Sequence, residues 1–202
     1  MGPPPVKYVT TSDGLSIAYA VSGDGPPLVF MPTALNHIQL LWQESYVRLW
    51  LEGLAVRFRL IQYDSRGRGM SSRGMPADLT LADCCLDLPA VVGRLELSPF
   101  VLLTSSPIES YVAVRYTIEN PGQVRALVLA SPIVHGEAVP RVWIGSFAEE
   151  NWDAFLRNLA SFNGVSDLEA AVARMKQSVT QEDWLTKGGL PRRLTWRAIC
   201  RG

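Results

Sequence analysis

The first candidate for chemistry is a serine between a predicted strand and a predicted helix. Residues 100–114 read FVLLTSSPIESYVAV, where an apolar run leads through Ser105 and Ser106 into a helical pattern. Many hydrolases carry their nucleophilic serine at a strained strand-to-helix turn, which exposes the hydroxyl. That reaction also needs a histidine base, an acid that orients the histidine, and two backbone N–H donors for the oxyanion.

The residues around Ser106 depart from this requirement. The turn reads TSSPI, so no glycine flanks the serine and Pro107 follows it directly. Because proline has no backbone N–H, one oxyanion donor is missing. Loss of one such donor costs about 10²–10³ in rate, or about 3–4 kcal/mol. Proline also restricts the residue before it, which predicts that the strained turn does not form.

A histidine base is hard to find in this chain. The sequence has two histidines, His37 and His135, and neither stands where a base that follows the serine and its acid is expected. We expect both to be loop residues. Glu137 and Asp153 are unassigned as acids. Glu109 is either an acid beside Ser106 or a solvated first-turn carboxylate favoured by the helix dipole.

Composition indicates one ordinary globular domain. The chain has 202 residues, of which 48% are hydrophobic and 19% charged, enough for a sizeable core. Nineteen basic residues balance 19 acidic ones, so nothing favours nucleic acid or an anionic membrane as partner. The N-terminal MGPPPVKYV does not resemble a secretory signal, and no run reaches the length of a transmembrane helix. We expect a soluble, cytoplasmic protein.

The cysteines do not indicate a disulfide framework or a metal site. Cys84 and Cys85 are adjacent and Cys200 is distant, an odd count that favours free thiols in a reducing compartment. No spacing suggests zinc, and we expect no cofactor. Cys85 lies on a predicted helix without a histidine at a useful spacing, so we do not expect it to be a nucleophile.

The positioning elements alternate between strands and helices. Strands are predicted at 6–10, 15–21, 27–31, 58–63, 100–104 and 124–130, and helices at 40–55, 80–95 and 110–120, with Pro89 interrupting the second helix. Strands separated by helices require crossovers, so the fold is α/β with a mostly parallel sheet, and the first two strands add an antiparallel hairpin. Amphipathic helices follow at 147–162 and 168–179, and a third begins near 181.

Together these segments resemble the α/β-hydrolase superfamily. The most specific segment is 63–71, YDSRGRGMS, which is similar to the D-x-R-G-x-G-x-S loop of that family. The Asp13-Gly14 turn, the GDGPPLV run at 23–29 and the Asn120-Pro121 helix end with its following strand also match. The resemblance covers about residues 8–132.

The resemblance implies a core, a cap and a site. The core is expected at 1–135, with about six of eight strands and helices on both sheet faces, a helical cap at 136–190 and an irregular tail at 191–202. Ser106 takes the nucleophile position, and Ala34 is the candidate second oxyanion donor, although Thr33 stands where the family has glycine. The strand–Asp–strand–His portion is missing, so the chain reads as a truncated member.

Two functions follow from the resemblance, and they belong to different classes. One is a catalytically silent or impaired protein that binds a small molecule between core and cap. The other is an esterase-like hydrolase of small esters through Ser106. The strand at 124–130 would lie at an exposed sheet edge, which predicts a homo-oligomer through that edge unless the tail covers it.

Two further motifs have simpler interpretations. Gly67-Arg68-Gly69 lacks the pattern of a phosphate loop, so we expect a turn held by Asp64 and Arg66. Several aromatic residues could line a pocket between sheet and cap, but core packing explains most of them. These residues are Trp42, Trp50, Trp143, Trp152, Phe155 and Phe162.

Overall fold

A six-stranded, mostly parallel sheet organises the chain. The computed structural model describes residues 2–33, 36–75, 79–130, 151–162 and 167–183. The sheet order is β1-β2-β4-β3-β5-β6, from strands at Val6–Thr10, Ser16–Ser22, Arg59–Tyr63, Pro27–Phe30, Phe100–Thr104 and Val124–Leu129. The pairs β1–β2 and β2–β4 are antiparallel, and the other three pairs are parallel. The predicted α/β architecture and its opening hairpin are confirmed.

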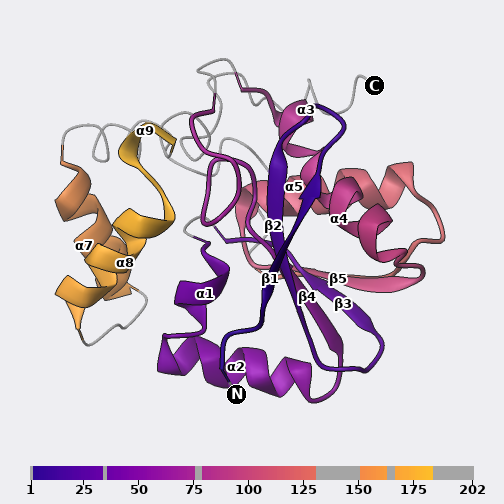
Figure 1. Ribbon diagram of the computed structural model, residues 1–202, viewed down its shortest axis with the longest axis horizontal. Coiled ribbons are helices and arrows are strands. Elements are labelled where there is room, and N and C mark those ends of the chain that lie inside the picture. Colours follow the sequence, from indigo (N-terminus) through magenta and orange to yellow (C-terminus); the bar gives the residue numbers. More distant parts are fainter. Residues whose placement is uncertain (1, 34–35, 76–78, 131–150, 163–166, 184–202) are drawn as a thin grey trace.

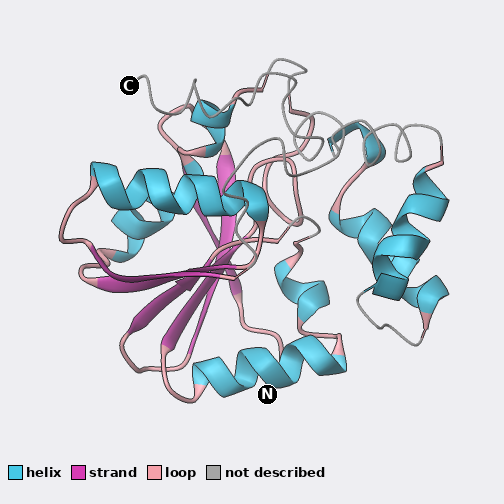
Figure 2. Ribbon diagram, turned by 180° about the vertical axis from the view of Figure 1, so that it is seen from behind, coloured by secondary structure: helices cyan, strands magenta, loops and turns pink. Residues whose placement is uncertain are grey.

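Helices cover both faces of the sheet (Figure 2). One face carries α3 (Leu81–Cys84), α4 (Asp87–Leu95) and α5 (Pro107–Glu119), whose apolar side chains pack with alternate strand residues such as Val29, Ile61 and Leu102. The opposite face carries α1 (Ile38–Leu41) and α2 (Ser45–Ala55), which pack on Leu28 and Leu60. Because the central strands are buried on both sides, their sequences are continuous apolar runs.

Two helices predicted as single are each divided into two. The helix expected at 80–95 breaks at Cys85 and Leu86, which places Pro89 in the first turn of α4, where a missing N–H breaks no helical hydrogen bond. Thr80 begins α3 with a capping box to Asp83. The helix expected at 40–55 becomes α1 and α2, separated by a turn after Trp42.

Three further helices lie beside this core (Figure 1). They are α7 (Trp152–Phe162), α8 (Leu168–Ser178) and the short α9 (Gln181–Asp183), and the predicted helices in this part of the sequence are therefore confirmed where the structure describes them. In the Figure 1 view, α7 and α8 pack together on the side of the molecule where α1 lies.

Strand β6 is the last strand of the sheet among the described residues. It pairs with β5 on one side, and the side chain of Val128 is 45% exposed. No helix in the described part of the chain is long and apolar enough to cross a bilayer.

Candidate functional site

The loops that follow β3, β4 and β5 meet at one edge of the sheet. These strands are mutually parallel, so their carboxyl ends lie together, which is where open α/β sheets place their ligands. Ser106 follows β5, Asp64 and Ser65 follow β4, and Asn36 lies in the loop after β3. All four side chains are buried.

Ser106 occupies the junction between β5 and α5, as predicted, but its backbone is relaxed. Its φ of −121° and ψ of 137° are extended, and it is the residue that immediately precedes helix α5. These angles are those that a following proline favours. Pro107 is the first residue of α5, a position where the missing N–H costs no helical hydrogen bond.

Local hydrogen bonds hold the Ser106 backbone in this conformation. The Ser110 hydroxyl and N–H both donate to the Ser106 carbonyl oxygen, at 2.7 and 2.8 Å. The Ser106 N–H donates to the Thr104 hydroxyl at 3.3 Å. Within the described ranges, no histidine or carboxylate hydrogen-bonds to the Ser106 hydroxyl, so its position alone does not activate it as a nucleophile.

Glu109 is buried, so the interpretation of this residue as a solvated carboxylate is wrong. Its side chain is 6% exposed and accepts a long hydrogen bond of 3.4 Å from the Ser65 hydroxyl. The Tyr63 phenol lies close enough for the Glu109 charge to matter. Burial first, and then the Glu109 charge, raise the pKa of Tyr63 well above its usual value. Glu109, in the first turn of α5, therefore interacts with Tyr63 at the end of β4 and with Ser65 in the loop that follows β4.

The other candidates for the triad are not brought to Ser106. His37 precedes α1, where its Nδ1 accepts from the Leu40 N–H at 3.4 Å. Burial and the Arg73 charge lower the pKa of His37, which favours the neutral ring. Asp153 forms an ion pair with Lys176 at 2.7 Å. Ala34, His135 and Glu137 lie outside the described residues.

Asp64 is the polar centre of the D-x-R-G loop. Its carboxylate is fully buried and accepts from the N–H groups of Met70 and Ile38, at 2.9 and 3.0 Å, and from the Asn36 side-chain amide at 2.5 Å. Burial raises the pKa of Asp64 to about 6, while these hydrogen bonds act in the opposite direction. Asp64 thereby joins the loop after β4 to the loop after β3.

Gly69 is required by this arrangement. Its φ is +51°, and a Cβ there would lie 2.2 Å from a carboxylate oxygen of Asp64. The backbone of the loop can approach the carboxylate closely only without a side chain. The glycines of the motif thus serve the turn, as predicted, and need no phosphate ligand.

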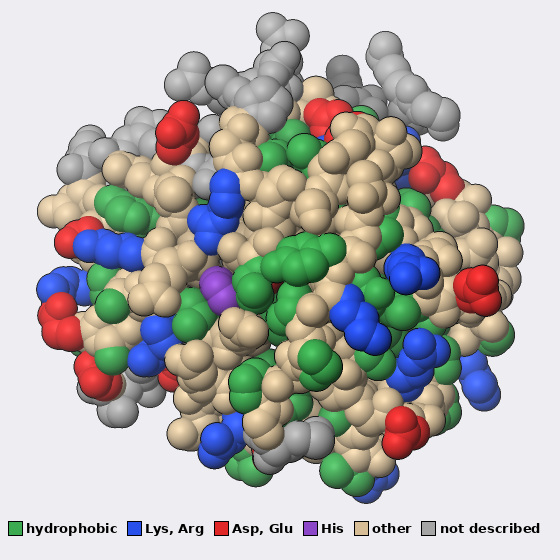
Figure 3. Space-filling view, viewed as in Figure 1, with side chains coloured by type: hydrophobic (Ala, Val, Ile, Leu, Met, Phe, Trp, Pro, Cys, Tyr) green, Lys and Arg blue, Asp and Glu red, His purple; other side chains and the backbone are tan. Residues whose placement is uncertain are grey.

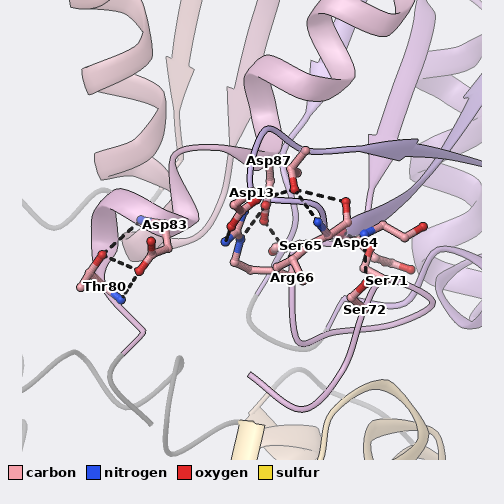
Figure 4. Close-up of polar contacts among 12 residues, drawn as sticks. Asp13, Asp64, Ser65, Arg66, Ser71, Ser72, Thr80, Asp83 and Asp87 are labelled. Carbon is pink, nitrogen blue, oxygen red and sulfur yellow. Dashed lines mark hydrogen bonds and ion pairs between the residues drawn. The ribbon is translucent and has the colours of Figure 1, made fainter. Parts of the chain in front are cut away.

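Arg66 anchors the same loop from the other side (Figure 4). Its guanidinium is 1% exposed and pairs with Asp87 of α4 at 2.7 Å and with Asp13 of the β1–β2 turn at 2.6 Å. Burial alone would lower the pKa of Arg66, but the two carboxylates outweigh it and raise the pKa. The expected turn held by Asp64 and Arg66 is confirmed.

Helix α8 is docked on this loop by its C-terminal end. The Gly69 N–H donates to the Ser178 carbonyl at 2.8 Å. The Arg73 guanidinium donates to the carbonyls of Gly69 and Gln177, at 2.7 and 2.8 Å. An additional ion pair joins Arg174 of α8 to Glu44, next to α2. The D-x-R-G loop, Arg73 and Glu44 therefore all contact α8 from the core.

The remaining candidates for chemistry have structural roles. Cys84 and Cys85 are free thiols, and burial raises the pKa of Cys85 to about 12, which leaves it protonated at neutral pH. Trp42 donates to the buried Gln62 side chain at 2.9 Å, and its ring belongs to the core. No cluster of three metal-ligating side chains occurs in the described part of the chain.

Two contributors to the site were not identified from the sequence. Asn36 is 2% exposed and links the loop after β3 to Asp64 and to the Tyr63 carbonyl. Ser65, which stands at the variable second position of the D-x-R-G motif, donates a hydrogen bond to Glu109. Their sole sequence signal is a polar residue in the loop that follows a predicted buried strand.

The surface around these elements carries charges of both signs. On the face drawn in Figure 3, basic and acidic side chains are interspersed, with hydrophobic side chains between them. This distribution agrees with the balanced composition of the chain.

Comparison with known proteins identifies the fold. The structure is similar to a hydrolase from Pseudomonas aeruginosa PA01, with a TM-score of 0.73, 22% identity, and coverage of 96% of this chain and 74% of that chain. It is also similar to the esterase RhEst1 from Rhodococcus sp. ECU1013, with a TM-score of 0.69, 23% identity, and coverage of 90% and 72%. For an esterase from Exiguobacterium antarcticum the TM-score is 0.70, with 18% identity and coverage of 98% and 76%. No family model and no curated protein matches the sequence.

Proposed function

We propose that this protein, which has the α/β-hydrolase fold, binds a small molecule between its core and its helical cap without hydrolysing it. Residues 1–135 form the core and 136–190 the cap in this proposal, with 191–202 as a tail. The observation that carries it is the relaxed backbone of Ser106 before Pro107. A serine nucleophile in this fold needs a strained turn and an N–H on the next residue, and this chain has neither.

The packing around the turn supports a structural role for Ser106. Its carbonyl is held by two hydrogen bonds from Ser110, and its backbone begins α5. No described histidine contacts it, since His37 is engaged at the start of α1. Without a base, the hydroxyl keeps its ordinary low nucleophilicity.

The contacts of α8 support a binding role for the cap. The C-terminal end of this helix accepts hydrogen bonds from the Gly69 N–H of the D-x-R-G loop and from the Arg73 guanidinium, and the loop lies at the carboxyl edge of the sheet. A binding function needs no catalytic group. On α7, Trp152 stacks on Phe155 at a ring-centroid distance of 5.4 Å and supplies apolar surface on the cap side.

A second candidate is hydrolysis of small carboxylic esters through Ser106. Two observations favour it: the serine stands directly after β5, and similar solved structures include proteins named as esterases. In this alternative the base and the acid would come from residues outside those described.

A serine-directed fluorophosphonate probe separates the two candidates. The silent protein is expected to show no labelling and no release of p-nitrophenolate from p-nitrophenyl butyrate above a buffer blank. Labelling that persists in Ser105→Ala and disappears in Ser106→Ala would establish the esterase and refute the silent protein. Ser105 is the matched control because it is the exposed neighbour of the buried Ser106.

The same ester tests binding independently of turnover. The chain has six tryptophans, so a ligand between core and cap is expected to quench tryptophan fluorescence in a saturable way. Saturable quenching without p-nitrophenolate release is the expected result. Linear, non-saturating quenching would contradict the binding role for this class of ligand.

A further inference from the structure

The outer face of α2 carries an apolar stripe that no other described residue covers. Tyr46, Leu49, Trp50 and Val56 are 83%, 71%, 43% and 84% exposed. Their three- and four-residue spacing, with Val56 at the C-terminal cap, places them on one side of the helix. The opposite side, with Leu51 and Ala55, is buried against the sheet. A contiguous exposed apolar stripe of this kind is typical of an interaction site.

The stripe contains a glycine that the chain itself does not need. Gly53 lies inside α2, where glycine costs about 1 kcal/mol relative to alanine. A Cβ at this position would meet no atom within 4 Å. Neither a turn nor close packing against the described part of the chain explains the residue, but a close approach by another helix would.

The stripe is complementary to a second copy of itself. Leu49 and Gly53 lie the same number of residues before and after Leu51, and so do Tyr46 and Val56. When two copies of α2 pack antiparallel about the level of Leu51, Leu49 of each copy faces Gly53 of the other. The large side chain then enters the gap above the glycine, and Tyr46 meets Val56. We propose that the protein self-associates through this face of α2, as a two-fold symmetric dimer.

Two other features agree with this occupant. Arg48 and Glu52 flank the stripe as an i,i+4 pair 4.0 Å apart, so the antiparallel arrangement sets opposite charges near each other across the two-fold axis. Trp50 is held by an edge-to-face contact with Phe30 at 4.9 Å, which fixes it at low entropic cost for binding. In the lower part of the molecule, where Figure 1 places α2, hydrophobic side chains show between charged ones in Figure 3.

The expected dimer is weak. Helix α2 has 11 residues and is therefore about 16 Å long. Two such helices alone bury less than the roughly 1,200–2,000 Å² of a stable interface, so we expect a reversible dimer that forms only at high protein concentration. The edge of β6 is the competing surface, because it was predicted from the sequence to mediate association.

Sedimentation velocity over about a hundred-fold concentration range tests the proposal on the full chain. The average mass of the wild type is expected to rise with concentration, and Leu49→Glu is expected to stay at the monomer mass. Ile118→Glu, on the exposed side of α5 at 74% exposure, is the matched control and should associate like the wild type. A wild type that stays monomeric overturns the proposal. So does association that survives Leu49→Glu but is lost in Val128→Glu on β6.

A swap of the two facing residues tests the register. Gly53→Leu alone places two large side chains opposite each other and should weaken association at least tenfold. Leu49→Gly combined with Gly53→Leu restores one large and one small partner at each contact and should recover association. Far-UV circular dichroism checks that each variant is folded. Equal association of the single and the double variant would overturn the antiparallel register and with it the proposed dimer.

Discussion

Replacement of Asp64 by asparagine should change how the stability of the protein depends on pH. Burial raises the pKa of this carboxyl from 3.8 to about 6 in the folded protein. Between these two values the folded state binds more protons than the unfolded state. The free energy of unfolding therefore falls as the pH rises through this window. Ionised Asp64 costs stability at neutral pH, although its hydrogen bonds reduce that cost.

The magnitude follows from the size of the shift. Each pKa unit corresponds to about 1.4 kcal/mol, so Asp64 contributes about 3 kcal/mol of lost stability between pH ~3 and pH ~7. No allowance for solvent screening is needed, because the side chain is fully buried. Asparagine does not titrate, so Asp64→Asn lacks this contribution. The variant instead leaves one buried N–H without its acceptor, which should lower the free energy of unfolding by about 1–3 kcal/mol at every pH.

Urea unfolding followed by tryptophan fluorescence at several pH values measures the effect. The stability of the wild type minus that of Asp64→Asn should fall by about 3 kcal/mol from pH ~3 to pH ~7. Asp13 and Asp83 have lowered pKa values that act in the opposite direction, but they are common to both proteins and cancel in the difference. Asp24→Asn, in an exposed turn, controls for the loss of one negative charge. Parallel profiles for wild type and Asp64→Asn would refute the reasoning.

Three other substitutions test the D-x-R-G loop. Arg66→Met removes the ion-pair partner of the buried Asp87 and of the partly exposed Asp13 and should lower the free energy of unfolding by about 3–5 kcal/mol, whereas Arg115→Met, in an exposed ion pair, should lower it by less than about 1 kcal/mol. A loss below 1 kcal/mol for the first in urea unfolding would contradict the buried pair. Gly69→Ala should lower the free energy of unfolding by at least about 2 kcal/mol, because the positive φ at this residue and the nearby Asp64 carboxylate both oppose a Cβ. An unchanged urea midpoint would disprove the close approach of the Gly69 backbone to Asp64. Arg73→Ala should speed amide hydrogen exchange in α8 by about three- to tenfold, because it loses the hydrogen bonds that link the Gly69 carbonyl to the Gln177 carbonyl at the end of α8. Unchanged exchange would rule out this docking role.

The elements of the fold were largely predictable from local sequence patterns. The predicted bounds of all six strands agree with the structure to within one residue, because apolar runs between turn residues mark buried strands. The positions of the helix breaks, at Trp42 and at Cys85, were not predicted, because the helical spacing of apolar residues continues across both. Pro89 was recognised as an interruption, but the chain avoids a kink by beginning a new helix just before it.

The candidate site was predictable only in part. The position of Ser106 and its restriction by Pro107 follow from the order of the residues alone. The burial of Glu109 does not, because the same first-turn carboxylate would be exposed on an uncovered helix. It is the sheet beneath α5 and the loop after β4 that enclose it.

What the sequence by itself determined is therefore the local part of this protein. Turn residues, apolar periodicity, the Thr80 cap and the conformation before Pro107 each depend on a few neighbouring residues. Tertiary structure decided which distant polar groups meet: Asp64 with Asn36, Arg66 with Asp13 and Asp87, and the D-x-R-G loop with the end of α8. The physical reason is that a buried charge must find partners wherever the chain brings them. Partners that are 21 to 109 positions away in the sequence become neighbours only when the sheet has formed.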